Sequence, residues 1–167
     1  MSNSISRIFR CLSHGVYVIG VSNGGKYNAF TAAWLTQVSF DPLLLALSIN
    51  PSHSSWPLIK ASGRFSVNVL NSEQQEMAAH FGKPALEIDK LGSVAWRLSP
   101  AQMPILDHAL AWMDCEYSHE TPAGDHLVVI ARVNAGKLNQ SAIAPLLYRD
   151  TGNMDGSSAL FPESFQH

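Results

Sequence analysis

The hydrophobic positions near the start of the chain form a short run that is typical of a β-strand. Val16 to Val21 is rich in β-branched side chains, and a second extended segment covers Tyr27 to Ala33. Ser22-Asn23-Gly24-Gly25 lies between them. Asn-Gly between two such runs favours a type I′ turn, because both central residues of that turn need positive φ. The pattern therefore predicts an antiparallel hairpin here.

Five more segments have strand-like patterns. Phe65 to Leu70 alternates apolar and polar side chains with period two, as expected for a strand with one buried face. Two apolar segments are separated at Asp41-Pro42, since proline fixes φ and donates no hydrogen bond. A turn at Pro122 to Asp125 precedes the last strand. Besides Phe65 to Leu70, the expected strands are 37–40, 43–49, 109–117 and 126–133.

Two helices are predicted from their end signals. Ser55 precedes Trp56 to Ala61, where Pro57 is tolerated in the first turn and Gly63 lies just beyond the end. Ser72 and Gln75 form a capping-box pattern, and the following helix would place Met77, Ala78 and Phe81 on one face before Gly82 ends it. Residues 83–104 read as irregular, and the chain beyond Tyr148 reads as a loosely packed or partner-covering extension.

These elements define the expected fold class. About seven strands with hairpin-type connections and two helices favour a mostly β protein, an antiparallel barrel with peripheral helices. We expect residues 1–167 to form a single domain, with a barrel over about residues 10–150 and a C-terminal extension over 151–167. The apolar tail and the faces around Trp96 and Trp112 are expected to be covered by a second copy of the chain.

Composition excludes several classes of protein. The chain has 167 residues, of which 46% are hydrophobic and 14% charged, with a formal net charge of −2. A disordered chain needs the opposite balance, and a nucleic-acid-binding domain needs a basic surface. The longest apolar runs are strand-sized, so no membrane segment is expected. Cys11 and Cys115 stand far apart, which indicates reduced thiols and a cytoplasmic protein.

The familiar sequence motifs of several enzyme classes are missing. The chain contains no Gly-x-Gly-x-x-Gly after a strand, no Gly-x-x-x-x-Gly-Lys-Ser/Thr and no Gly-x-Ser-x-Gly. This disfavours a Rossmann fold, a phosphate-binding P-loop and an esterase nucleophile elbow. The seven histidines form no His-Glu-x-x-His motif. Glu116, His119 and Glu120 come nearest to a metal site, but their side chains should alternate between strand faces, so no metal is expected.

Several short segments resemble a known family when they are taken together. They are Ala29-Phe30-Thr31-Ala32-Ala33-Trp34, Val38-Ser39-Phe40-Asp41-Pro42, Ser48-Ile49-Asn50-Pro51, Ser62-Gly63-Arg64-Phe65-Ser66-Val67-Asn68-Val69-Leu70, Phe81, Gly124-Asp125-His126 and Pro145-Leu146-Leu147-Tyr148. In order and spacing they are similar to the flavin reductase-like, FMN-binding split-barrel proteins. The similarity extends to the reductase module at the C-terminal end of some diflavin proteins. It implies an antiparallel split β-barrel of Greek-key type.

The resemblance implies where the cofactor FMN would bind. In the family, the stretch from Thr31 to Trp34 lies along the isoalloxazine ring, and the loop after the next strands binds the ribityl chain and phosphate. The implied cofactor-binding residues are Thr31, Ala32, Ala33, Trp34, Ser48, Asn50, Ser52, His53, Ser54, Ser55, Phe81 and Lys83. His53 is the candidate cation of the loop, with Arg64 or Lys83 as alternatives. The same residues also fit an ordinary strand end and a helix cap.

Asp125 and His126 are the catalytic candidates. In the family, this histidine lies near the flavin and the nicotinamide, and an imidazole there could orient the pyridine amide or relay a proton. The alternative is a turn aspartate beside a surface histidine. Many relatives have serine or threonine in place of Ala33 and Pro-Pro in place of Pro42-Leu43. Ala33 removes a side-chain donor near flavin N5, which would change redox tuning rather than binding.

The activity implied is that of an NAD(P)H-dependent flavin oxidoreductase. Hydride would pass from NADH or NADPH to FMN, and the electrons would go to free flavin, oxygen or a partner protein. The resemblance also implies a homodimer. The alternative function is a non-catalytic FMN-binding electron relay without direct nicotinamide chemistry, which would use the same residues for the flavin.

Overall fold

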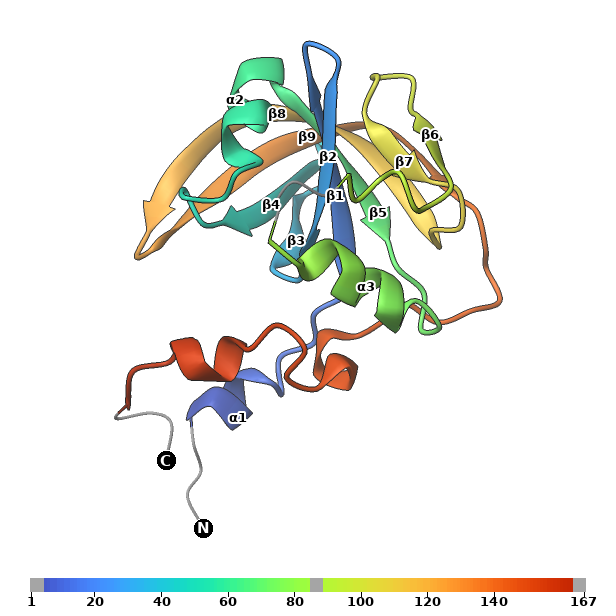
Figure 1. The fold of residues 1–167 in the computed structure, drawn as a ribbon. Coiled ribbons are helices and arrows are strands. Elements are labelled where there is room, and N and C mark those ends of the chain that lie inside the picture. The colour runs from blue at the N-terminus through green and yellow to red at the C-terminus, as the bar shows by residue number, and fades with distance from the viewer. Residues whose placement is uncertain (1–4, 85–88, 164–167) are drawn as a thin grey trace.

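The computed structural model describes residues 5–84 and 89–163. Its main feature is a curved seven-stranded sheet in the order β2-β1-β5-β8-β9-β4-β3, in which every neighbouring pair is antiparallel. The strands are β1 (Tyr17–Asn23), β2 (Lys26–Ala32), β3 (Leu35–Ser39), β4 (Leu44–Ile49), β5 (Arg64–Val69), β8 (Ala111–Ala123) and β9 (His126–Leu138). The mostly β antiparallel barrel expected from the sequence is confirmed (Figure 1).

The two edges of this sheet meet at Ala33 and Trp34. β2 and β3 lie at opposite ends of the strand order, yet only these two residues separate them in the chain. The sheet therefore curls round until its edges are joined covalently, and the barrel is split there. The strand order beyond β1 comes from long-range pairing: β5 pairs with β1 and β8, and β9 pairs with β8 and β4. This seam determines where backbone groups remain outside the sheet's ladder.

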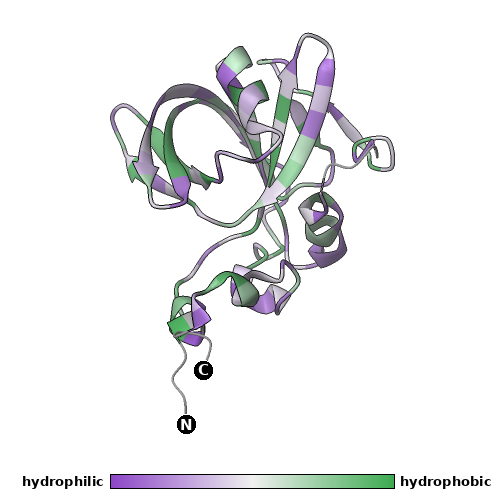
Figure 2. Ribbon diagram, turned by 60° about the vertical axis from the view of Figure 1, so that its left-hand side comes forward, coloured by the Kyte–Doolittle hydropathy of each residue, from purple (hydrophilic) through white to green (hydrophobic). Residues whose placement is uncertain are grey.

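The helices and the C-terminal tail, which is described from residue 148 to residue 163, lie around the barrel. α2 (Trp56–Ser62) and α3 (Gln75–Gly82) pack on β1, β2 and β5, whereas α1 (Ile5–Phe9) and the short helices η1 (Tyr148–Thr151) and η2 (Ser157–Leu160) lie together at one end. Figures 1 and 2 show this terminal group projecting from the barrel, with both chain ends in it. No helix among the described residues is long and apolar enough to cross a membrane.

Apolar side chains are buried on both faces of β1. Ile19 and Val21 point into the barrel with Phe30, Leu47 and Phe65. Val18 lies in a second cluster, which contains Val16, Ala29, Leu70, Ala78, Phe81 and Leu106 and packs beneath α3. Each cluster removes apolar surface from water, which is the main source of folding free energy. One cluster closes the barrel and the other fixes α3 beside β2.

The first hairpin has the predicted turn type, displaced by one residue. Asn23 pairs with Lys26, so the two central residues are Gly24 and Gly25, with φ of 57° and 78°. Both angles are positive, as a type I′ turn requires. The prediction centred the turn on Asn23-Gly24, which is wrong by one position. Glycine tolerates this conformation without a Cβ penalty at both central positions.

The predicted half-buried strand is buried on both faces. Ser66 and Asn68 of β5 are fully buried, together with Phe65 and Val67. They lie under β7 (Pro104–Leu106), which pairs with β6 (Trp96–Leu98). Gly20 lies at the same contact, and a Cβ there would collide with Ser66 Oγ and the Pro104 carbonyl. The expectation that 83–104 is irregular is therefore wrong for the β6–β7 part, and 85–88 lies outside the described residues.

The predicted helices form, but their caps differ. α2 begins after Ser55 and ends before Gly63 (φ 67°), as expected, yet Ser55 makes no capping hydrogen bond. α3 begins at Gln75, so Ser72 does not cap it. Asn71 Oδ1 instead accepts from the Glu73 N–H, and Gln74 Oε1 accepts from the Asn71 N–H. These two hydrogen bonds stabilise the turn that precedes α3, so the predicted capping box at the start of the helix does not form.

The two tryptophans named for a partner surface differ in exposure. Trp112 is only 8% exposed, because its own chain covers it, whereas Trp96 is partly buried and packs against the exposed Tyr27 with ring centroids 5.4 Å apart. Coverage of these faces by a second copy stays a prediction.

The last two strands are longer than the predicted 109–117 and 126–133, and they form a long ribbon whose Gly124-Asp125 turn joins Ala123 to His126.

Candidate functional site

A cavity of about 280 Å³, here called the barrel cavity, opens at the seam of the barrel. Its wall combines residues from the β2–β3 junction, the loop after β4, the start of β9 and the tail. They are Phe30, Thr31, Ala32, Ala33, Trp34, Ser48, Ile49, Asn50, His53, His126, Tyr148, Asp155, Ser157 and Leu160. Eight of the fourteen predicted site residues are among them. They are Thr31, Ala32, Ala33, Trp34, Ser48, Asn50, His53 and His126.

The β2–β3 junction presents backbone rather than side-chain donors to this cavity. Ala33 and Trp34 fall between the two edge strands, and their carbonyls accept hydrogen bonds from Leu35 and Ser48. Within residues 5–84 and 89–163, neither Ala33 nor Trp34 donates its N–H to another backbone group. Backbone donors left unpaired by protein normally find water or a ligand. These amides are available to a polar ligand edge.

Thr31 contributes in a different way from that expected. Its Oγ1 donates a 2.7 Å hydrogen bond to the Ala78 carbonyl of α3. Because a hydroxyl has one proton, this bond commits the donor, and only oxygen lone pairs remain for a ligand. Thr31 therefore ties β2 to α3 at the wall of the cavity.

The loop from Asn50 to Ser55 folds on its own side chains. Asn50 Oδ1 accepts from the Ser52 N–H at 2.9 Å, and His53 Nδ1 accepts from the Ser55 N–H at 3.2 Å. Ser52 and Ser54 are exposed on the same loop, although neither reaches the cavity wall. The hydroxyl of Ser55 points inward: the residue is fully buried, and its Oγ accepts from Asn28 Nδ2 at 3.1 Å.

His53 is not the positive charge of this loop. Burial lowers its pKa from the model-peptide value of 6.5, and the charge of Lys90 lowers the pKa further. Its ring also packs on Phe30, with centroids 4.3 Å apart. The imidazole is therefore neutral near pH 7. The nearby cation is Lys90, only 5% exposed, whose Nζ donates to the Phe81 carbonyl at 3.1 Å.

Lys90 was missed at the sequence level. It lies in a segment without periodicity, and nothing in the sequence indicates a buried lysine. The two alternatives named for this charge lie elsewhere: Lys83 is exposed just after α3, and Arg64 borders a separate cavity with Asp114 and Glu116. Phe81 is also away from the cavity wall, because its ring is buried in the cluster under α3.

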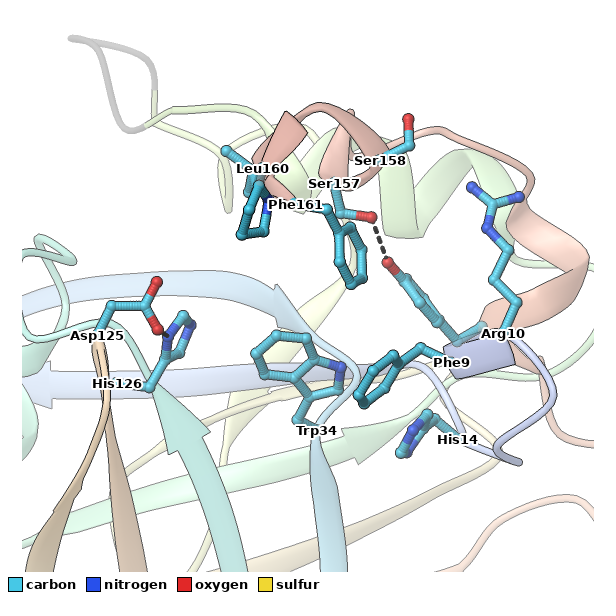
Figure 3. Close-up of a pocket in the computed structure, with 12 residues that line it drawn as sticks. Phe9, Arg10, His14, Trp34, Asp125, His126, Ser157, Ser158, Leu160 and Phe161 are labelled. Atoms are coloured by element: carbon cyan, nitrogen blue, oxygen red, sulfur yellow. Dashed lines mark hydrogen bonds and ion pairs between the residues drawn. The ribbon is translucent and has the colours of Figure 1, made fainter. Parts of the chain in front are cut away.

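Asp125 and His126 form a hydrogen-bonded pair at the end of the β8–β9 ribbon. His126 Nδ1 donates to Asp125 Oδ1 at 2.8 Å, since a carboxylate only accepts. Asp125 is exposed, and its hydrogen bond to His126 is the main cause that lowers its pKa below 3.8. The imidazole ring packs against Trp34, with centroids 5.1 Å apart (Figure 3). The pair holds one imidazole nitrogen and leaves Nε2 for another partner.

A second cavity of about 200 Å³, here called the tail cavity, adjoins the first. Both cavities are bordered by Trp34, His126, Tyr148, Ser157 and Leu160, and Figure 3 shows the aromatic side chains that line the tail cavity. Phe9, Arg10, His14, Asp125, Ser158, Phe161 and Pro162 complete its wall. The tail, expected to be loosely packed, therefore lies against the predicted site.

Tyr148 connects the tail to the barrel. Its hydroxyl donates to Asp155 Oδ2 at 2.7 Å and is hydrogen-bonded to Ser157 Oγ at 2.7 Å. Burial raises the pKa of this phenol. Its backbone N–H donates to the His14 carbonyl at 2.8 Å. The sequence offered one signal for Tyr148, its place in the family-like segment 145–148, but no role.

The residues that suggested a metal site have other partners. Glu116 accepts from Asn134, and Glu120 pairs with Lys60 at 2.9 Å. His119 is hydrogen-bonded to Ser118. In the part of the chain that the structure describes, no three potential metal ligands come together.

Comparison with known proteins decides the family. The model of the flavin reductase like domain matches residues 9–157. This chain belongs to that family. The resemblance found in the sequence and the split-barrel fold it implied are thereby confirmed, and the match reaches from α1 to the start of η2.

Individual relatives agree. A flavin reductase of Pseudomonas putida is 33% identical over 143 residues, covering 86% of this chain and 82% of the relative. A nitrilotriacetate monooxygenase component B homologue from Mycobacterium thermoresistibile is 34% identical, with a TM-score of 0.78 over 86% of this chain and 83% of that one. The NADH:FAD oxidoreductase of Streptomyces globisporus is 26% identical, with a TM-score of 0.79 and 86% coverage of both chains.

Some relatives are longer than this chain. It spans only 40% of a Rhizobium meliloti relative to which it is 35% identical over 128 residues. The names of the relatives favour flavin reductase chemistry over the electron-relay alternative.

Proposed function

We propose that this chain is an NAD(P)H-dependent flavin reductase that binds FMN in the barrel cavity. Hydride passes from NADH or NADPH to the flavin, and the electrons continue to free flavin, oxygen or a partner protein. One observation carries the proposal: three groups of polar residues meet at the two adjoining cavities. The seam amides of Ala33 and Trp34 and the Asn50 loop border the barrel cavity, and the Asp125–His126 pair borders the tail cavity beside it. Bound FMN would supply the hydride acceptor.

The ring of the flavin would be held by backbone. The N–H groups of Ala33 and Trp34 suit the polar edge of an isoalloxazine, since sheet edges carry unpaired donors. Ala32 and Ala33 have small side chains that let a flat ligand approach the backbone closely. Ala33 also lacks a hydroxyl, so it would not add a side-chain donor to the ring. Thr31 and Ser48 would shape the same wall.

The phosphate arm would extend toward the loop after β4. Asn50 and His53 border the cavity, and the exposed hydroxyls of Ser52 and Ser54 follow on the same loop. Lys90 would supply positive charge, because its buried ammonium lies close enough to His53 to lower that residue's pKa. The remaining predicted residues would act indirectly: Ser55 through its bond to Asn28 and Phe81 through packing under α3.

The donor side would be formed by Trp34, Asp125 and His126. Hydride transfer needs the nicotinamide stacked on the flavin, so an open face beside the bound ring is required. Trp34 and His126 border both cavities, which fits a position between the two nucleotides. Asp125 would orient the imidazole through its 2.8 Å hydrogen bond, leaving Nε2 to face the donor.

We also propose a homodimer. The β3–β4 hairpin exposes Val38, Phe40 and Leu43, and Phe40 is 87% exposed. Apolar side chains grouped on one surface mark an interaction site. β3 begins at the barrel seam, whereas Phe40 and Leu43 lie in the turn at the other end of the hairpin, outside the cavity wall. A monomeric mass from light scattering at micromolar concentration would contradict the dimer.

The proposal also includes a cellular setting and an electron acceptor. Cys11 and Cys115 are free, and burial followed by the charge of Asp114 raises the pKa of the Cys115 thiol to about 12. Cysteines without a disulfide fit a cytoplasmic protein. Because one similar structure is a monooxygenase component, we propose an oxygenase as the partner protein. We also propose that residues 1–167 form one domain, because residues of the barrel and of the described C-terminal tail border the same cavities.

The deciding experiment is an anaerobic visible spectrum of the protein reconstituted with FMN, recorded before and after addition of NADH or NADPH. Bleaching of the oxidised-flavin bands within seconds is expected. Parallel titrations with FAD and riboflavin test the preference for FMN. A flavin spectrum that persists with both donors would leave only the relay function, and failure to bind FMN at all would refute the proposal.

A further inference from the structure

Arg10 places a positive charge at the wall of the tail cavity without forming an ion pair among the described residues. The residue follows α1 and lines the cavity. Its Nη2 donates to Asn153 Oδ1 at 3.5 Å, which is a neutral partner at the limit of hydrogen-bonding distance. Among residues 5–84 and 89–163, no ion pair includes Arg10. A guanidinium with free donors is suited to phosphate.

The side chains around it form a polar group at this end of the cavity. Asn153 Oδ1 also accepts from the Ser158 hydroxyl at 2.8 Å, so Arg10 and Ser158 share one acceptor. The nearby carboxylate, Asp155, accepts from the Tyr148 hydroxyl and the Ser157 N–H; it keeps its negative charge but forms no ion pair with Arg10. The guanidinium is thus oriented by the tail without being paired to it.

The opposite end of the cavity has the opposite charge. Figure 3 shows Arg10 at one end, Asp125 and His126 at the other, and Trp34 and Phe161 between them. A ligand with an aromatic ring and a phosphate would be aligned by this arrangement. The anionic group is drawn to Arg10 and repelled by Asp125, while a ring that becomes cationic on losing hydride is stabilised beside Asp125.

We infer that Arg10 binds a phosphate of the nicotinamide donor, whose nicotinamide ring lies at the Trp34–His126 end of the tail cavity. This inference rests on the proposed function, because it takes the donor to be a reduced nicotinamide nucleotide. Arg10 is then a substrate-binding residue that determines donor affinity. It has no part in flavin binding, since it lies outside the barrel cavity.

The test compares Arg10→Gln and Arg10→Lys with Arg7→Gln. Arg7 lies on α1 and is exposed outside both cavities, so its substitution removes the same charge from the same part of the chain. Flavin reduction is measured with NADPH, NADH, reduced nicotinamide mononucleotide and the phosphate-free donor 1-benzyl-1,4-dihydronicotinamide. Equilibrium binding of NADP⁺ and NAD⁺ by calorimetry gives a readout independent of catalysis.

With Arg10→Gln we expect KM for the phosphate-bearing donor to rise roughly tenfold, with kcat and FMN affinity unchanged, since hydrogen bonds to charged groups are among the stronger ones. Arg10→Lys should restore part of the loss, and Arg7→Gln should behave as the parent. If KM rises with NADPH alone, Arg10 binds the 2′-phosphate. If KM rises with NADPH and NADH but not with the mononucleotide, Arg10 binds the pyrophosphate bridge. If KM also rises with the mononucleotide, Arg10 binds the 5′-phosphate. The phosphate-free donor should show no change.

Equal effects of Arg10→Gln and Arg7→Gln on every donor would overturn the inference, as would an equal loss with the phosphate-free donor. The proposed function fails separately if no donor reduces the bound flavin. In that case, Arg10-dependent binding of NADP⁺ or NAD⁺ would still support the phosphate contact, and its absence would refute both.

Discussion

The rings of Trp34 and His126 lie 5.1 Å apart between centroids and are inclined by 52°. Trp34 belongs to the short link between the two edge strands, and His126 begins β9 after the Gly124-Asp125 turn. Trp34 and His126 are 92 positions apart in the sequence. They meet because β4 pairs with both β3 and β9. This contact separates the barrel cavity from the tail cavity and gives both an aromatic border.

Replacing Trp34 by alanine should weaken donor use. The side chain is 48% exposed at the junction of the cavities, and stacking of an aromatic side chain on a base contributes about 1–3 kcal/mol. We expect kcat/KM for NADH or NADPH to fall roughly tenfold, a value within that range, as measured by stopped-flow reduction of bound FMN. Leu138→Ala is the control, because Leu138 is an exposed apolar side chain outside both cavities and away from the β3–β4 hairpin. Similar losses in the two variants would contradict a specific role of Trp34.

Stability should fall as the pH decreases through the titration of His53. Its folded-state pKa lies below the unfolded value of 6.5, so the unfolded chain binds more protons between the two values. The stabilising contribution is therefore fully present above about pH 6.5 and decreases as the pH falls below it. Protonation at Nδ1 would also break the hydrogen bond from the Ser55 N–H.

Urea unfolding midpoints between pH 7.5 and 5 measure this effect. His53→Gln should flatten the dependence on pH, and His119→Gln, on the exposed part of the β8–β9 ribbon, serves as the control. An unchanged slope in His53→Gln would show that other groups cause the pH dependence.

Thr31→Val should lower stability without lowering flavin affinity. The change removes the 2.7 Å hydrogen bond to the Ala78 carbonyl, at a cost of about 1 kcal/mol, and keeps the shape of the side chain. Chemical denaturation should detect the loss, and a fluorescence titration should give the FMN dissociation constant of the parent. Thr36→Val on β3, where the hydroxyl is exposed, is the matched control. Marked weakening of FMN binding would instead indicate a direct contact of the hydroxyl with the cofactor.

Asn68→Ala should destabilise the attachment of the β6–β7 hairpin to the barrel. Asn68 is fully buried: its Nδ2 donates to the Val18 carbonyl at 3.0 Å, and its Oδ1 accepts from the Leu106 N–H at 2.8 Å. Leaving buried backbone groups unpaired costs about 1–3 kcal/mol each, so a loss of about 2 kcal/mol or more is expected. Hydrogen exchange at Leu106 should rise. The exposed Asn134→Ala should change neither quantity, and equal losses in both variants would contradict the prediction.

Local patterns in the sequence predicted most of the elements. The run from Val16, the alternation from Phe65 and the signals around α2 each record a local property: burial of a β-branched side chain, the two faces of a strand, or the start and end of a helix. The segments from Ala29 to Trp34 and at Asp125-His126 also pointed to the correct part of the fold. Both lie at the cavities.

Tertiary structure decided what each predicted residue faces. Ser55 and Thr31 have hydroxyls suited to a ligand, but Asn28 and the Ala78 carbonyl occupy them. The buried ammonium of Lys90, from a segment without periodicity, binds the Phe81 carbonyl, and its charge lowers the pKa of His53. Arg10 and the C-terminal tail come beside the site because residues 146–148 pair with residues 14–16 of the chain.

The sequence by itself therefore determined the strands of the seven-stranded sheet, helices α2 and α3, the fold class and the family. Only the tertiary structure decided which polar groups remain free for a ligand and where the positive charges lie. The physical reason is that periodicity and turn signals depend on neighbours in the chain. Hydrogen-bond partners and charge environments at the barrel seam instead depend on strand pairing and tail packing between residues far apart in sequence.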